Sequence, residues 1–133
     1  MSKRVLKFTV QRKTWYRGKG ADESRLCTLD GEKCCLGFLA RALGYRHDRI
    51  LNRGTPDDVF KNGDDGTKTR INKWPASLVE AMLMENGKTD YTNTELCSRL
   101  MNLNDDTSIT EEYREKRLTV VFKEAGIQVQ FKG

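Results

Sequence analysis

The pattern of residues 108–131 constrains the fold more than any other part of the chain, because it predicts a helix followed directly by a strand. Ser108 and Glu111 have the spacing of a capping box, which satisfies free backbone amides at a helix start. One apolar face follows, formed by Leu118, Val121, Phe122 and Ala125. Gly126 is a typical stop, and the alternation of IQVQF over 127–131 predicts a half-exposed strand.

Three further elements are indicated in the first 44 residues. Alternation over residues 3–10 predicts a strand with Leu6, Phe8 and Val10 on one face. Residues 11–25 have no sustained period and predict a long loop, after which Asp30-Gly31 is typical of a tight hairpin turn. A helix is predicted after the hairpin, with an apolar face of Leu36, Leu39, Ala40 and Leu43 and a stop at Gly44.

The middle of the chain is less regular. Glycines and polar runs over about 54–74 indicate an irregular excursion. Pro75 suits a first helical position and Asn86-Gly87 a helix stop, so a helix is predicted near 76–85. Thr92 and Glu95 form a second capping box, which predicts a helix reaching about Leu103.

These elements predict an α+β fold, with a small antiparallel sheet of the N-terminal strand, a short hairpin and the C-terminal strand, packed by about four helices. A chain of 133 residues is the size of one domain, and we expect residues 1–133 to form one. No run approaches the ~20 apolar residues that cross a bilayer, and the N-terminal residues do not resemble a signal peptide. We therefore expect a cytoplasmic protein with free thiols and no membrane contact.

Positive charge is concentrated in the N-terminal part. Residues 1–53 hold 13 of the 24 Lys and Arg residues but only 5 of the 19 Asp and Glu residues. This asymmetry favours an anionic partner, such as a nucleotide, a nucleic acid or an acidic protein surface. The acidic balance of the remaining residues argues against a protein that coats nucleic acid uniformly, so a local basic contact patch is expected. A solvated basic surface with no specific ligand is the alternative.

The loop at 12–25 combines charge, glycine and aromatic residues. The glycines of Arg17-Gly18-Lys19-Gly20 would let backbone amides approach an anion, and Trp15 and Tyr16 could stack a base. The candidate binding residues are Arg12, Lys13, Trp15, Tyr16, Arg17, Lys19 and Arg25. The alternative is that Trp15 fixes the loop in the core while the charges are solvated.

The cysteines suggest a second, weaker candidate. Cys34 and Cys35 open the helix at about 36–43, and the one histidine of the chain, His47, follows about a dozen residues later. Adjacent cysteines beside leucine and phenylalanine are more often buried small hydrophobes. The cysteine spacing does not fit a structural zinc site, so no metal and no cofactor is predicted. The acidic pairs, including Asn104-Asp105-Asp106, are typical of turns and caps.

Three segments carry a resemblance: TWYRGKG, GEKCCLGFLARALG and LMNLNDDTSITEEYREKRLTVVFKEAGIQVQF. They resemble those of a family of small, largely uncharacterised accessory proteins encoded by bacteriophages. The resemblance implies an accessory role in the bacterial cytoplasm. It brings no established activity, so no catalytic residue carries over to this chain.

The leading hypothesis from the sequence is a non-enzymatic binding protein that modulates or inhibits a host or anti-phage defence component through its basic N-terminal surface. The first alternative is a nucleotide or nucleic-acid binding protein, including one that sequesters a signalling nucleotide. The second is a cysteine-dependent enzyme that would use Cys34, Cys35 and His47.

Overall fold

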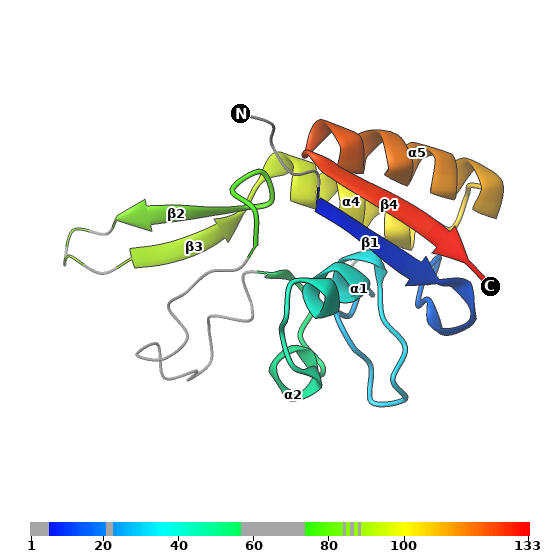
Figure 1. Ribbon diagram of the computed structural model, residues 1–133, viewed down its shortest axis with the longest axis horizontal. Helices are drawn as coiled ribbons and strands as arrows, with labels where there is room; N and C mark the ends of the chain where they lie inside the picture. Colours follow the sequence, from blue (N-terminus) through cyan, green and yellow to red (C-terminus); the bar gives the residue numbers. More distant parts are fainter. Residues whose placement is uncertain (1–5, 21–22, 57–73, 84, 86, 88) are drawn as a thin grey trace.

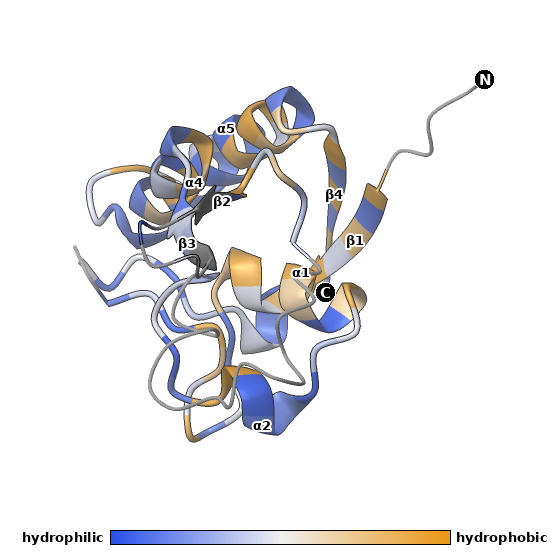
Figure 2. Cartoon of the chain, turned by 90° about the vertical axis from the view of Figure 1, so that its left-hand side faces the viewer, coloured by the Kyte–Doolittle hydropathy of each residue, from blue (hydrophilic) through white to orange (hydrophobic). Residues whose placement is uncertain are grey.

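The computed structural model describes residues 6–20, 23–56, 74–83, 85, 87 and 89–133, and these have an α+β fold (Figure 1). Strands β1 (Leu6–Gln11) and β4 (Ile127–Lys132) lie side by side. Helices α4 (Glu95–Asp105) and α5 (Glu111–Glu124) lie on one side of this strand pair, as Figure 2 shows. The core is formed between the pair and the helices.

The alternating pattern of both strands determines which residues enter the core. Phe8 and Val10 of β1 are buried, as are Ile127 and Val129 of β4, while the residues between them are more exposed. The ring of Phe8 packs edge-on against Phe122 of α5, with centroids 5.1 Å apart. The predicted strands are thereby confirmed, although residues 3–5 lie outside the described part.

The direction of pairing differs from the prediction. β1 and β4 run parallel, with Leu6 opposite Ile127 and Gln11 opposite Lys132, whereas the sequence suggested an antiparallel sheet. Alternation shows which face of a strand is buried but not the direction of its neighbour. Parallel neighbours need a crossover connection, which the intervening helices supply.

Helix α1 (Cys35–Ala42) confirms the helix predicted over this segment, and its apolar face is buried. Gly37 is packed against the backbone of Leu26. A Cβ atom built on Gly37 would lie 1.8 Å from the Leu26 carbonyl oxygen, so a larger residue cannot fit without moving the chain. The four-residue helix α2 (His47–Ile50) follows, and Ile50 is fully buried.

The helix predicted near 76–85 is wrong. The segment forms strand β2 (Val79–Leu83), which pairs antiparallel with β3 (Thr89–Asn93). Asn-Gly is a strong hairpin signal as well as a helix stop, and Gly87 has a φ of 81°. Pro75 begins a turn, in which its carbonyl accepts from the amides of Leu78 and Val79.

The two helices predicted from capping boxes are confirmed, but in each the capping residue lies two positions after the one that the pattern indicated. Thr94 caps α4 by accepting a hydrogen bond from the Cys97 amide at 3.3 Å, and Thr110 caps α5 in the same way from the Tyr113 amide at 3.1 Å. Most of the excursion predicted at 54–74 lies outside the described residues.

Candidate functional site

Trp15 fixes the 12–25 loop in the core. Its side chain is only 4% exposed, and its ring lies 5.2 Å from that of Phe131. The indole Nε1–H donates to the Asn104 side-chain oxygen at 2.8 Å. The ring therefore has no free face on which a base could stack. Of the two roles that the sequence left open for Trp15, the structure supports the one in which Trp15 fixes the loop in the core.

Asn104, at the end of α4, is the centre of a buried hydrogen-bond network. Its Oδ1 accepts from Trp15 and from the Cys35 amide at 3.0 Å. Its Nδ2 donates to the Tyr16 carbonyl at 3.0 Å and to an Asp105 carboxylate oxygen at 3.2 Å. Asn104 is fully buried, and its hydrogen bonds join the loop, α1 and α4. Its role is therefore larger than that of the turn residue that the sequence suggested.

The glycine amides of the loop are used within the chain. Gly18 donates to the Asn104 carbonyl at 2.7 Å, and Gly20 donates to the Asp105 carbonyl at 2.9 Å. These two carbonyls lie at the C-terminal end of α4, where helical carbonyls lack partners. The Arg17-Gly18-Lys19-Gly20 segment thus caps the C-terminal end of α4. It uses for this the backbone amides that the sequence suggested would bind an anion.

Arg114 completes this cap from α5. Arg114 is only 1% exposed, although most other charged residues of this helix face solvent. Its guanidinium donates to the Leu103 carbonyl at 2.6 Å and the Asn104 carbonyl at 3.2 Å, and it lies 3.3 Å from Glu111. The cation is favourable at this negative end of a helix dipole.

Two arginines of the loop are paired with glutamates of α5. Arg12 forms a bidentate ion pair with Glu115, at 2.7 and 2.8 Å. Arg17 pairs with Glu111 and lies over the Trp15 ring at 4.4 Å. Desolvation raises the pKa of Glu111, but hydrogen bonds from Arg17 and Arg114 outweigh it, so the pKa is lowered overall.

The remaining candidates of the loop are more accessible. Lys13 and Lys19 are exposed, and Lys19 lies 6.0 Å from the ring of the half-buried Tyr16. Arg25 is half-buried and donates to the Ser24 carbonyl at 2.8 Å. That this loop binds a partner stays a prediction.

A polar pocket of about 350 Å³ lies beside Arg25. Asp105 lines it and also lines a neighbouring pocket of about 240 Å³. Within the described ranges, both hydrogen bonds to the Asp105 carboxylate, from Ser24 and Asn104, reach Oδ1. Oδ2 can therefore accept from an N–H or O–H donor of a small ligand.

The thiols of Cys34 and Cys35 do not meet His47. Burial raises the pKa of Cys34 to about 12 and the pKa of Cys35 well above its usual value, which opposes thiolate formation. His47 lies instead beside Cys27, with the Cys27 Sγ atom 3.9 Å from His47 Nδ1. Only the fold brings residues 27 and 47 together, so spacing along the sequence gave no signal for this contact.

A different surface, which the sequence did not single out, surrounds the turn at 28–32. The tight turn is confirmed, with a φ of 87° at Gly31, but its arms do not pair as a hairpin of the sheet. Lys33 bridges to Trp15 and Cys27 to Leu51. Three hydrogen bonds between Thr28, Gly31 and Glu32 close the turn, at 2.7 to 3.0 Å.

Leu29 projects from this turn and is 81% exposed, the most exposed of the large hydrophobic side chains in the described part. The turn lies in the light-blue segment of Figure 1, at the same end of the molecule as α2. We call the surrounding patch the Leu29 surface, and it consists of Leu29, Lys33, Phe38, Arg41, His47 and Leu51. The sequence feature that could have indicated this surface is a leucine inside a predicted turn, where apolar residues are uncommon.

Several members of the Leu29 surface lie close to one another or to the turn. Lys33 donates to the Gly31 carbonyl at 3.2 Å and lies 5.5 Å from the Phe38 ring. Desolvation lowers the pKa of His47, and the positive charges of Arg41 and Lys33 lower it further. Leu51, next to Cys27 through the bridge, is 42% exposed. The surface therefore combines exposed apolar side chains with several cations.

Within the described ranges, no three side chains of His, Cys, Asp or Glu are placed to hold a metal ion. No described helix has the length and apolar character needed to cross a membrane. Comparison of the chain with protein-family models, with curated proteins and with solved structures gave no match.

Proposed function

We propose that this chain is a non-enzymatic binding protein that modulates or inhibits a host or anti-phage defence component, and that it contacts an acidic surface of that component through the Leu29 surface. The observation that carries the proposal is the 81% exposed Leu29 on a closed turn, to which Lys33 is joined through the Gly31 carbonyl. The charges of Lys33 and Arg41 both act on His47, so cations gather near this turn. The resemblance to phage accessory proteins supports a partner from the host.

Leu29 has the properties of an interface anchor. Burying a leucine side chain contributes about 1.5–3 kcal/mol. The turn is already closed by three hydrogen bonds, so little conformational entropy is lost when a partner covers it. Lys33 and Arg41 would attract an acidic partner and speed its association.

The accessible residues of the 12–25 loop extend the same basic N-terminal half. Lys13, Tyr16 and Lys19 remain available for a partner, whereas Arg12 and Arg17 would first have to leave Glu115 and Glu111. We therefore expect the loop to contribute less to binding than the Leu29 surface.

Quantitative capture from bacterial lysate tests the proposal. Immobilised wild-type protein should retain one host protein in stoichiometric amount, and Leu29→Ser should weaken that interaction about tenfold or more, as truncation of an interface anchor does. Lys33→Glu and Arg41→Glu should slow association and reduce its dependence on salt.

Val120→Ser is the matched control, because Val120 is an exposed hydrophobic residue on α5, 43% accessible and outside the Leu29 surface. It should retain the partner with wild-type affinity. The proposal fails if no stoichiometric partner is recovered, or if Leu29→Ser and Val120→Ser behave alike.

The polar pocket at Asp105 favours a second candidate, binding of a nucleotide. A nucleobase amino or imino group could donate to Oδ2 of Asp105. A nucleotide that binds the folded chain should raise the melting temperature, and Ser98→Trp, an exposed position lining the pocket, should abolish that rise. A panel of linear and cyclic nucleotides that leaves the melting temperature unchanged at low salt would remove this candidate.

A further inference from the structure

One backbone edge of strand β4 has no strand partner in the described part of the chain. Among the described residues it pairs with β1 alone, in a two-stranded parallel sheet. Beyond that pairing, no described residue forms a hydrogen bond with the β4 backbone. Isolated two-stranded sheets are marginal, and an open edge is a template for another strand.

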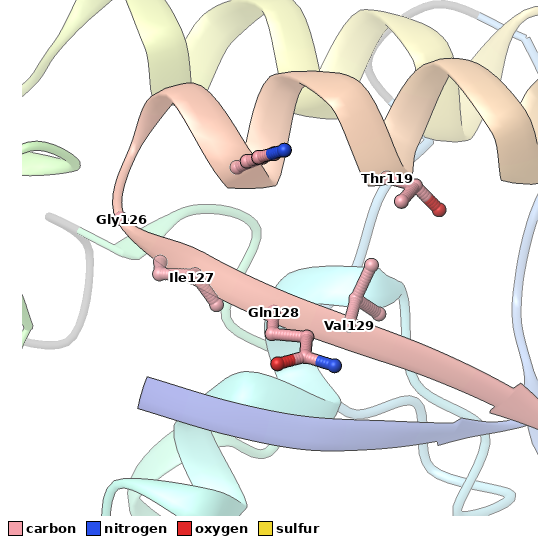
Figure 3. A pocket seen from close by; sticks show the side chains of 6 residues that line it. Thr119, Gly126, Ile127, Gln128 and Val129 are labelled. Carbon is pink, nitrogen blue, oxygen red and sulfur yellow. The ribbon is translucent and has the colours of Figure 1, made fainter. Parts of the chain in front are cut away.

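A groove follows this open edge. It has a volume of about 440 Å³ and is lined by Thr119 and Lys123 of α5 and by Gly126, Ile127, Gln128 and Val129. Figure 3 shows α5 running along β4 on the side away from β1, with Thr119 and Val129 directed toward each other. A strand laid beside β4 would therefore be covered by α5.

The edge lacks the features that protect free strands from pairing. Proteins protect such edges with prolines, bulges or charged residues. From Ile127 to Phe131 β4 has none of these, and its one charge is Lys132 at the end. This sequence is therefore compatible with addition of a strand along most of its length.

Charge indicates what kind of strand fits. Lys123 is exposed, and its ammonium group has no hydrogen-bond or ion-pair partner among the described residues. The α5 glutamates Glu115 and Glu124 are paired with Arg12 and Arg99. The wall of the groove thus presents an unpaired positive charge to an occupant, which an acidic side chain complements.

A second copy of the chain fits the groove poorly. Each copy carries its own α5 beside β4, so pairing two β4 edges would bring two covering helices to the same place. A single extended segment has no covering helix and needs only the width of one strand.

We propose that the edge of β4 and the adjoining wall of α5 bind an extended acidic peptide segment of another protein by strand addition. Main-chain hydrogen bonds to β4 supply the binding, apolar side chains of the peptide contact Val129 and Thr119, and an acidic side chain meets Lys123. This site is separate from the Leu29 surface, and it does not depend on the proposed function of that surface.

NMR titration of the isotope-labelled protein tests the proposal. The probes are synthetic heptapeptides in which valine or isoleucine alternates with threonine and aspartate. At least one of them should shift the amide signals of Gly126, Ile127, Gln128 and Val129, with a Kd below about 1 mM. The bound protein should also protect amides of β4 from hydrogen exchange.

Two methylated forms of the best peptide separate strand addition from other contacts. Alternate amides of a strand face opposite edges, so methylating one alternate set removes the donors that face β4, while the other set faces solvent. One form should lose at least tenfold in affinity and the other should stay within about twofold.

Lys123→Glu should weaken the peptide about three- to tenfold, because it replaces an exposed attraction by a repulsion. Lys116→Glu is the matched control, since Lys116 is exposed on the same helix and does not line the groove. The proposal is overturned if no peptide shifts the β4 amides, if both methylated forms weaken equally, or if the two lysine variants behave alike.

Discussion

Replacing Asn104 by alanine tests the hydrogen-bond network that holds the 12–25 loop. The side chain is fully buried and accepts from the Trp15 indole and the Cys35 amide, at 2.8 and 3.0 Å. In Asn104→Ala both donors lose their partner inside the core. A buried donor left unpaired costs about 1–3 kcal/mol, so two of them cost about 2–6 kcal/mol.

The loss is large compared with the whole stability of a domain, which is about 5–15 kcal/mol. Urea unfolding measured by the fluorescence of the two buried tryptophans, Trp15 and Trp74, gives the free energy of unfolding. Asn102→Ala on the same helix is the matched control, because Asn102 is exposed and should change stability by less than about 0.5 kcal/mol.

A double-mutant cycle with Trp15→Phe refines the test. Phenylalanine removes the indole donor, so the second substitution at Asn104 should then cost about 1 kcal/mol less than it does alone. The reasoning is refuted if Asn104→Ala destabilises no more than Asn102→Ala, or if the two substitutions are additive.

Three further predictions concern other parts of the molecule. Gly37→Ala should destabilise by several kcal/mol or prevent folding, because its Cβ would meet the Leu26 carbonyl, whereas Gly54→Ala, with ordinary spacing of 3.8 Å to the Ser24 carbonyl, should leave the melting temperature nearly unchanged. The lowered pKa of Glu111 means that its contribution to stability is present above its usual pKa of 4.5 and is lost as the pH falls through the lowered value. Acid titration of Arg17→Gln should therefore show a weaker loss of stability over this range than the wild type, and equal losses would contradict the assignment. Iodoacetamide at pH 8 should label Cys34 and Cys35 in the unfolded chain but not in the folded one, because burial raises both pKa values; rapid labelling of the folded chain would restore a thiol mechanism.

Local patterns predicted the parts of the fold that local physics controls. The periodicity of residues 118–125 and the alternation of 127–131 gave α5 and β4, since each signal arises from one face packing on the core. The helix predicted near 76–85 is wrong because Asn86-Gly87 suits both a helix end and a hairpin, and only pairing between β2 and β3 distinguishes the two.

The candidate site was less accessible from the sequence because its contacts are non-local. Arg17 meets Glu111 and Trp15 meets Asn104 across about ninety positions, and no spacing rule links them. A loop rich in Arg, Lys and Gly suggested an anion site, and the same chemistry serves here to cap α4 through Gly18 and Gly20. The exposed Leu29 could have been noticed, because a leucine in a turn has few neighbours to cover it.

Hydrogen–deuterium exchange on the complex with the captured host protein tests the central claim most directly. The proposed function predicts added protection of amides in residues 28–33 and 47–51, which include the turn that carries Leu29 and helix α2. Protection confined to the 12–25 loop, or to α5 alone, would contradict it.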